Sequence, residues 1–163
     1  MNTTTITKLH NLLAQALDAL QPLFLLMTRW YVSWQFLKSG WLKFSSWQTT
    51  LSLFRDEYHV PVLPPELAAV VGTFGELFFP VLLVLGLGGR IGALGLSAVN
   101  LMAVISYAYV LLAEGSEAAL AQHVLWGFML VTIALFGNGS LALERFWFKN
   151  QDKQPLAAAS RPM

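Results

Sequence analysis

The 163-residue sequence contains no cysteine. Disulfides, thiolate nucleophiles, cysteine-ligated zinc sites, iron–sulfur clusters and covalently attached c-type haem are therefore excluded for this chain alone. Charged residues are scarce as well, at 12% against the ~25% that is typical of soluble domains. Because 56% of the residues are hydrophobic, so few charges would not cover the surface of a soluble monomer. The composition indicates a membrane protein.

A surplus of basic residues is also lacking, since the formal net charge is only +1. A strongly basic nucleic-acid-binding protein is therefore excluded, because several phosphates could not be neutralised. The length of the chain favours a single domain.

Four stretches are long and apolar enough to cross a bilayer, which takes ~20 mostly apolar residues. They cover residues 20–42, 65–87, 91–113 and 120–146. The first is the least hydrophobic, because it contains Arg29, Ser33, Gln35 and Lys38. We therefore predict an all-α fold, a polytopic four-helix membrane bundle formed by residues 20–147.

The flanking segments predict interfacial helices and a tail. Residues 1–20 place apolar side chains on one helix face, so we expect an amphipathic helix on the cytoplasmic surface that turns into the first span near Pro22. Phe44, Trp47, Leu51 and Phe54 have the same spacing and predict a second helix, either in the outer interface or as a lid on the bundle. Residues 148–163 lack periodicity and are expected to be a disordered cytoplasmic tail.

The basic residues predict the orientation, because the richer side of a membrane protein is cytoplasmic. Lys43 and Arg55 fall on one side of the predicted bundle. The other side carries Lys8, Arg90, Arg145, Lys149, Lys153 and Arg161. We expect a multi-pass protein of a bacterial-type inner membrane with both termini in the cytoplasm.

Two charged residues lie deep in the predicted spans, Arg29 in the first and Glu76 in the second. A charge at a helix centre costs roughly 2.5–3.5 kcal/mol on insertion scales, so it needs a partner or water. Counted from the cytoplasmic ends of their spans, the two residues differ in depth by only ~5 Å. We therefore predict an intramembrane Arg29–Glu76 pair, which either serves function or only fixes the register of the helices.

Lys38 and Lys43 lie near the outer end of the first span, close to Trp34 and Trp41. One interpretation is that the lysines snorkel within an aromatic belt. The other is a site for an anion or for the carbonyl groups of a membrane quinone. The polar residues that would extend such a site from later spans are Asn100, Tyr107, Tyr109 and His123, although such residues more often form interhelical hydrogen bonds.

The outward-facing histidines do not predict a metal centre. His59 and His123 would lie at a similar depth to acidic residues, namely Asp56, Glu57, Glu114 and Glu117. Their spacing matches no compact ligand motif.

Several scattered residues resemble the pattern of DoxX-like membrane proteins over about residues 23–147. The opening of the pattern is carried by Arg29, Phe36, Gly40, Lys43 and Trp47. Its second span is similar to Glu76, the apolar run 80–87 and the turn 88–90. Its end resembles Gly137, Gly139, Leu141, Leu143 and Glu144, but Ala142 and Glu144 stand where the family has Ser and Asp.

This resemblance implies a four-helix inner-membrane protein. Characterised relatives are quinone oxidoreductase subunits, membrane partners of soluble redox enzymes in sulfur or oxidative-stress metabolism, or accessory proteins of peptide-modifying and copper-handling systems. Three functions follow for this chain: a quinone-linked redox subunit, a non-catalytic anchor for a soluble enzyme, or transport of a small solute or peptide. The expected partners are the lipid bilayer, a soluble or membrane protein and, for transport above all, further copies of the chain.

Overall fold

The computed structural model describes residues 3–88, 90–145 and 147. Its helices are α1 (Thr3–Ser45), α2 (Trp47–Asp56), α3 (Pro65–Leu85), α4 (Ile91–Ser106), α5 (Ala108–Leu111) and α6 (Glu117–Phe136). The all-α prediction is confirmed. The predicted tail at residues 148–163 lies outside the described residues.

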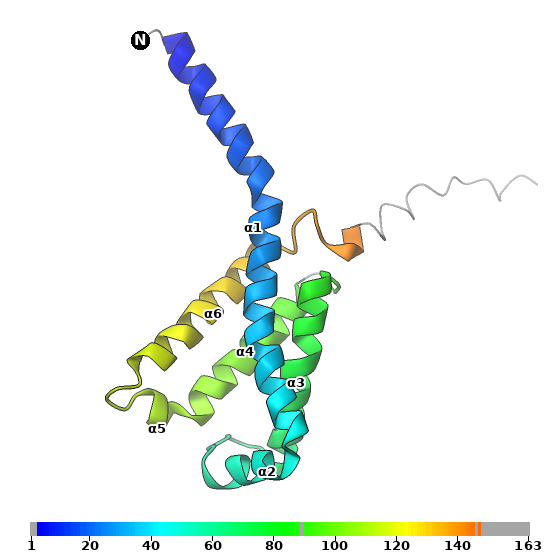
Figure 1. Ribbon diagram of the computed structural model, residues 1–163, viewed down its shortest axis with the longest axis vertical. Helices are drawn as coiled ribbons and strands as arrows, with labels where there is room; N and C mark the ends of the chain where they lie inside the picture. The colour runs from blue at the N-terminus through cyan, green and yellow to red at the C-terminus, as the bar shows by residue number, and fades with distance from the viewer. Residues whose placement is uncertain (1–2, 89, 146, 148–163) are drawn as a thin grey trace, which may run out of the picture.

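The C-terminal half of α1 packs along α3, and α4 packs against both α3 and α6 (Figure 1). The buried core joins α1, α3, α4 and α6. It contains Val32, Phe36, Leu83, Ala93, Leu96, Leu130 and Ile133. The N-terminal half of α1 projects beyond this bundle, and α2 lies across the opposite end (Figure 1).

Two of the described helices meet the length and hydropathy of a membrane span by themselves, α3 and α6. The third predicted span is divided, because α4 ends at Ser106 and the short α5 follows after Tyr107. The first predicted span is the C-terminal part of α1, whose polar residues lower its hydropathy.

Two predicted boundaries are wrong. The expected turn near Pro22 is absent, because α1 continues through this proline from Thr3 to Ser45. A proline removes one helical hydrogen bond, but the helix pattern on both sides of it is uninterrupted. The fourth span was expected to reach residue 146, whereas α6 ends at Phe136. Gly137 and Gly139 follow with positive φ angles of 82° and 76°, which end the helix.

The second predicted amphipathic helix is present as α2, which begins at Trp47, so that Phe44 belongs to α1, and α2 packs on the bundle. Phe54 is buried against Ala68 and Ala69 of α3. The hydroxyl of the buried Thr50 donates a 2.9 Å hydrogen bond to the carbonyl oxygen of Lys43. Since the last carbonyl groups of a helix lack helical partners, this bond joins the start of α2 to the end of α1.

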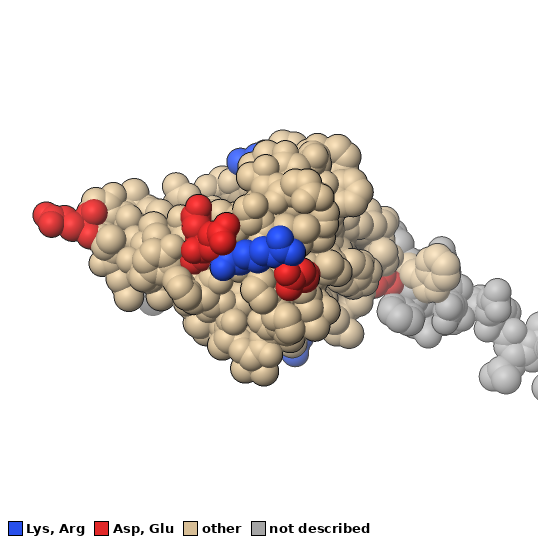
Figure 2. Space-filling model, turned by 90° about the horizontal axis from the view of Figure 1, so that it is seen from below, with Lys and Arg blue, Asp and Glu red and all other residues tan. Residues whose placement is uncertain are grey.

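The end of the molecule that carries α2 is mostly uncharged, with acidic and basic side chains in a few places (Figure 2). Arg55 of α2 and Glu66 of α3 form an ion pair on this surface, with Nη2 and Oε1 2.8 Å apart. Both side chains are more than half exposed, so the pair adds little to stability.

Candidate functional site

A buried ion pair joins α1 to α3 in the interior of the bundle. Lys43 Nζ lies 2.6 Å from Glu76 Oε1 and 2.7 Å from Glu76 Oε2. It also donates a 3.0 Å hydrogen bond to the hydroxyl oxygen of Ser39, one helical turn away. The side chains of Lys43 and Glu76 are only 13% and 8% exposed. The charges are therefore neutralised within the protein.

The close approach of α1 to α3 at this pair requires a glycine. A Cβ atom on Gly40 would lie 2.9 Å from Glu76 Cβ and 3.1 Å from the carbonyl carbon of Glu76. Any larger side chain at position 40 would therefore push α3 away. The absence of a side chain at Gly40 brings the carboxylate of Glu76 within reach of Lys43, which lies three residues further along α1.

The predicted Arg29–Glu76 pair is wrong. Arg29 lies 14 residues before Lys43, which corresponds to about 21 Å along a helix. Its Nη2 donates a 3.2 Å hydrogen bond to the carbonyl oxygen of Leu141, beyond the end of α6. The error arose because depth was counted from the ends of the predicted spans, whereas α1 extends far beyond the end of α3.

Arg29 instead belongs to the end of the bundle opposite α2. Its side chain is fully buried, and its Nε and Nη1 atoms have no hydrogen-bond partner among the described residues. Gly86 closes α3 beside it with a φ of 67°, where a Cβ atom would collide with Arg29 Nη1. Arg29 therefore connects α1 to the ends of α3 and α6.

A second polar contact lies between α4 and α6. His123 Nδ1 is 2.9 Å from Asn100 Oδ1, and Asn100 Nδ2 donates a 3.0 Å hydrogen bond to the backbone oxygen of His123. Since an amide oxygen only accepts, this arrangement places the proton of a neutral His123 on Nδ1. The other ring nitrogen, Nε2, then remains an acceptor.

These groups surround one cavity of about 650 Å³, which we call the central cavity. Its volume falls within the range of ligand sites in proteins. The polar residues of its lining are Gln35, Ser39, Lys43, Tyr58, Glu76, Ser106, Tyr107, His123 and Trp126. The remaining lining is apolar and aromatic, so a ligand of mixed character fits it.

Aromatic rings form much of the cavity wall. Phe36 and Trp126 meet edge to face with their centroids 5.5 Å apart, and Tyr58 meets Tyr107 in the same way at 5.1 Å. The Tyr107 hydroxyl donates a 3.3 Å hydrogen bond to Glu57 at the exposed end of the cavity. Burial and the nearby carboxylate of Glu76 raise the pKa of Tyr58 to about 12, so this hydroxyl keeps its proton.

Two buried polar groups of the lining have no hydrogen-bond partner among the described residues. They are the hydroxyl of Ser106 and the indole nitrogen Nε1 of Trp126. Because leaving a buried donor unpaired is costly, each such group needs an explanation. Both residues belong to the lining of the central cavity.

Only part of the predicted ligand site comes together. Lys43, Tyr107 and His123 line the central cavity, and Asn100 holds His123. Trp34, Trp41 and Lys38 lie instead on the exposed side of α1, with Trp34 and Trp41 51% and 64% exposed. No group of three or more His, Asp or Glu side chains within the described part of the chain is arranged to hold a metal ion.

The sequence did not reveal that Glu76 is the partner of Lys43, and several lining residues were not predicted. These are Ser39, Tyr58, Ser106 and Trp126. The spacing of Phe36, Gly40 and Lys43 places them on one helix face, and this was a usable signal for the side of α1 that meets α3.

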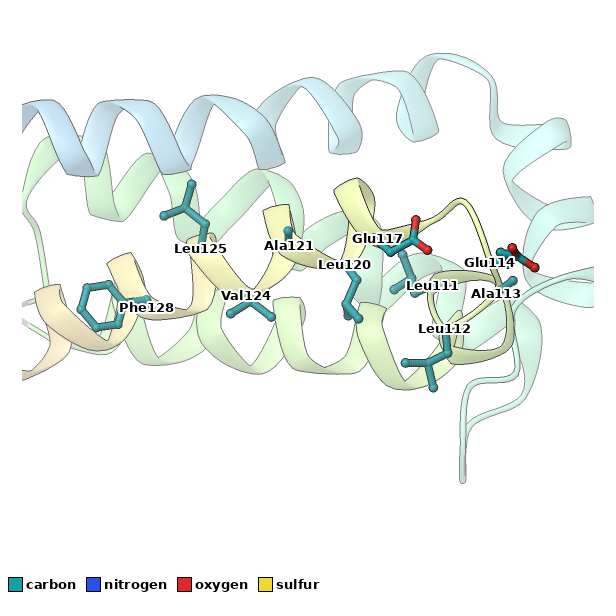
Figure 3. Close-up of a pocket in the computed structure, with 10 residues that line it drawn as sticks. All are labelled: Leu111, Leu112, Ala113, Glu114, Glu117, Leu120, Ala121, Val124, Leu125 and Phe128. Atoms are coloured by element: carbon teal, nitrogen blue, oxygen red, sulfur yellow. The ribbon is translucent and has the colours of Figure 1, made fainter.

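A separate groove lies on the outside of the bundle. It is formed by apolar side chains of α5 and α6, and Glu114 and Glu117 stand at one end of it (Figure 3). Val124 and Phe128 in this groove are 64% and 72% exposed. The groove is open and almost wholly apolar, as expected for a face that contacts lipid.

Comparison with known families identifies the chain. The model of the DoxX family matches residues 24–109, which is more than half of the sequence and includes Lys43 and Glu76. No curated protein and no solved structure matches the chain. The chain belongs to the DoxX family and is an integral membrane protein with helical spans.

Proposed function

We propose that this DoxX-family protein binds a membrane quinone in the central cavity and acts as the quinone-linked subunit of an oxidoreductase. The observation that carries the proposal is the pair of unpaired buried donors, Ser106 Oγ and Trp126 Nε1, in a cavity with aromatic walls. A quinone ring stacks on aromatic side chains and offers carbonyl oxygens that only accept hydrogen bonds. The residues present therefore fit this ligand.

The ion pair has a different role in this proposal. The three N–H groups of Lys43 already face Ser39 Oγ and the two carboxylate oxygens of Glu76. In this proposal Lys43 and Glu76 exchange protons with the quinone ring, while Ser106 and Trp126 orient the ring. His123 adds an acceptor at Nε2 for a hydroxyl group of the reduced ring.

A bound quinone supplies the capacity to take up two electrons together with two protons. The chain has no cysteine to hold an iron–sulfur cluster, so we assign the electron donor to a redox group of a partner protein. On this proposal the chain is a subunit of the enzyme, with the protons exchanged at Lys43 and Glu76.

Binding of a tritiated quinone to the purified protein in nanodiscs tests the proposal. We expect saturable binding to the wild type, and a loss of roughly two- to tenfold in affinity for Ser106→Ala and for Trp126→Phe, the effect of one hydrogen bond. Trp41→Phe is the matched control, because Trp41 is 64% exposed outside the cavity. Absence of saturable binding to the wild type, together with absence of quinone in its lipid extract, would contradict the proposal.

We also propose that both termini face the cytoplasm of a bacterial-type cell. The N-terminal half of α1 and the segment after α6 lie at the same end of the bundle, opposite α2 (Figure 1). Because the chain has no cysteine, single cysteines can report its orientation. A membrane-impermeant maleimide should label Ala113→Cys in intact spheroplasts and label Thr5→Cys only after lysis. The reverse pattern would contradict this orientation.

The exposed face of α1 favours a second candidate function, a membrane anchor for a soluble enzyme. Leu9, Leu13 and Leu17 are 53–63% exposed on the part of α1 that projects from the bundle. An apolar stripe of this kind binds either the membrane surface or a partner protein. If it holds a partner enzyme, Leu13→Asp should release that enzyme during purification and leave quinone binding unchanged.

A further inference from the structure

The central cavity reaches the outer surface of the bundle between α3 and α4. Five residues that line it are also exposed: Leu63 lies in the segment before α3, and the other four lie on the two helices, Val71 and Phe74 on α3 and Ala98 and Met102 on α4. Val71, Phe74 and Met102 are 50%, 58% and 40% exposed. Side chains that border both the cavity and the exterior mark an opening, which we call the lateral opening.

A close contact between the two helices limits the opening on the side away from α2. α3 and α4 touch closely where Gly75 meets Val99, since a Cβ atom on Gly75 would lie 2.7 Å from Val99 Cγ2. One turn nearer to α2, the lining residues of α3 are Val71 and Gly72, and Phe54 of α2 lies beside Gly72, since a Cβ atom there would be 3.4 Å from Phe54 Cζ.

The lateral opening faces the hydrocarbon of the bilayer and not the water at its surface. Phe74 is the tenth residue of the 21-residue helix α3, which meets the criteria of a membrane span. At 1.5 Å per residue it lies about 14 Å from the start of the helix, near the middle of a ~30 Å hydrocarbon layer. All five residues of the opening are apolar, as lipid contact requires.

We propose that the ligand of the central cavity enters sideways from the bilayer through the lateral opening and leaves a long apolar chain lying in it. This inference rests on the proposed function and specifies its substrate class: a quinone with an isoprenoid chain, in contrast to a short, water-soluble quinone. The ring lies beside the Lys43–Glu76 pair, and the chain extends between Val71 and Phe74 on one side and Ala98 and Met102 on the other.

Two quinone probes and a pair of neighbouring valines test the inference. Val71→Trp places an indole at the lateral opening, whereas Val70→Trp places one on the same helix, outside the cavity lining, at a position equally exposed (51% against 50%). The probes are menaquinone, which carries an isoprenoid chain, and menadione, its ring without the chain. Affinities are measured on the full-length protein in nanodiscs.

Val71→Trp should weaken menaquinone binding by at least about tenfold and change menadione binding by less than about twofold. Val70→Trp should change neither affinity. Ala98→Trp, on the α4 side of the opening, should also weaken menaquinone binding and leave menadione binding nearly unchanged. Its control is Leu94→Trp, because Leu94 is 58% exposed and lies outside the cavity lining.

Unchanged menaquinone binding in both opening variants would overturn the inference and leave the proposed function standing. Binding of menadione but not menaquinone by the wild-type protein would also overturn the inference and leave the proposed function standing. Wild-type protein that binds neither probe would remove the proposed function, and the inference with it.

Discussion

Glu76 is a carboxylate in the middle of an apolar helix, and Lys43 is its ion-pair partner. Taking an ion out of water costs several kcal/mol even after the protein relaxes, so an unpaired Glu76 would be strongly unfavourable. The bidentate contact at 2.6 and 2.7 Å offsets that cost. The pair places a proton donor and a proton acceptor next to the central cavity, where the proposed chemistry uses them.

Removing one partner of the pair should therefore destabilise the protein more than removing both. We expect Lys43→Met to lower the free energy of unfolding by about 3–5 kcal/mol, because it leaves a buried carboxylate without a partner. Adding Glu76→Gln should recover much of that loss. Denaturant unfolding in detergent micelles, analysed as a double-mutant cycle, measures the coupling.

Arg29 provides the control for this cycle. It lies at the other end of the bundle, so Arg29→Met and Glu76→Gln should be additive within about 0.5 kcal/mol. A large coupling between Arg29 and Glu76, or none between Lys43 and Glu76, would contradict the pairing described here.

The Tyr58 hydroxyl predicts a change of stability at alkaline pH. Its pKa of about 12 in the folded protein is above the ordinary value of 10.0, so the folded state favours the protonated form. This contribution is fully present below pH 10 and is lost as the pH rises through 12. Unfolding free energies measured across this range should fall less steeply in Tyr58→Phe than in the wild type, and an equal slope in the two proteins would contradict the raised pKa of Tyr58.

At the scale of helices, glycines decide how closely α1, α3 and α4 approach one another. Gly40 allows the backbone of α3 to come next to α1, and Gly75 receives Val99 of α4. The first contact brings Glu76 to Lys43, and the second limits the lateral opening on the side away from α2. The site therefore depends on glycines at the helix contacts as well as on the side chains that line the cavity.

The α1–α3 contact can be tested with one methyl group. Gly40→Ala should lower the free energy of unfolding by about 1–3 kcal/mol, the usual effect of overpacking, and should weaken quinone binding as the ion pair separates. Gly127→Ala is the matched control, since its Cβ atom would lie 3.4 Å from Asn100 Nδ2, close to an ordinary contact distance. Equal stability of the two variants would show that α1 and α3 do not approach at Gly40 as described.

At the scale of the whole molecule, hydrophobic length and periodicity predicted most of the fold. The second and fourth spans were located because α3 and α6 are long apolar runs, and α2 because Trp47, Leu51 and Phe54 recur on one helix face. The boundaries were less predictable. A proline such as Pro22 can either end a helix or lie within it, and only the surrounding packing decides between the two.

The site was predicted only in part, because it depends on the relative heights of the helices. Lys43, Glu76, Tyr107 and His123 stood out as polar residues in apolar surroundings, and all four line the central cavity. Their pairing was not predictable, since α1 extends far beyond the end of α3 and places Arg29 away from Glu76. Ser106 and Trp126 are ordinary residues in a membrane helix, and only their burial without a partner marks them.

Photolabelling with an azidoquinone, followed by mass spectrometry of the labelled peptides, tests whether the central cavity binds a quinone. We expect labels on residues of the central cavity, within 36–43, 72–79, 99–107 and 123–126, and we expect these labels to be lost when unlabelled quinone competes. Labels confined to the outer groove of α5 and α6, at residues such as Leu120 and Phe128 (Figure 3), and insensitive to competition would contradict quinone binding in the central cavity.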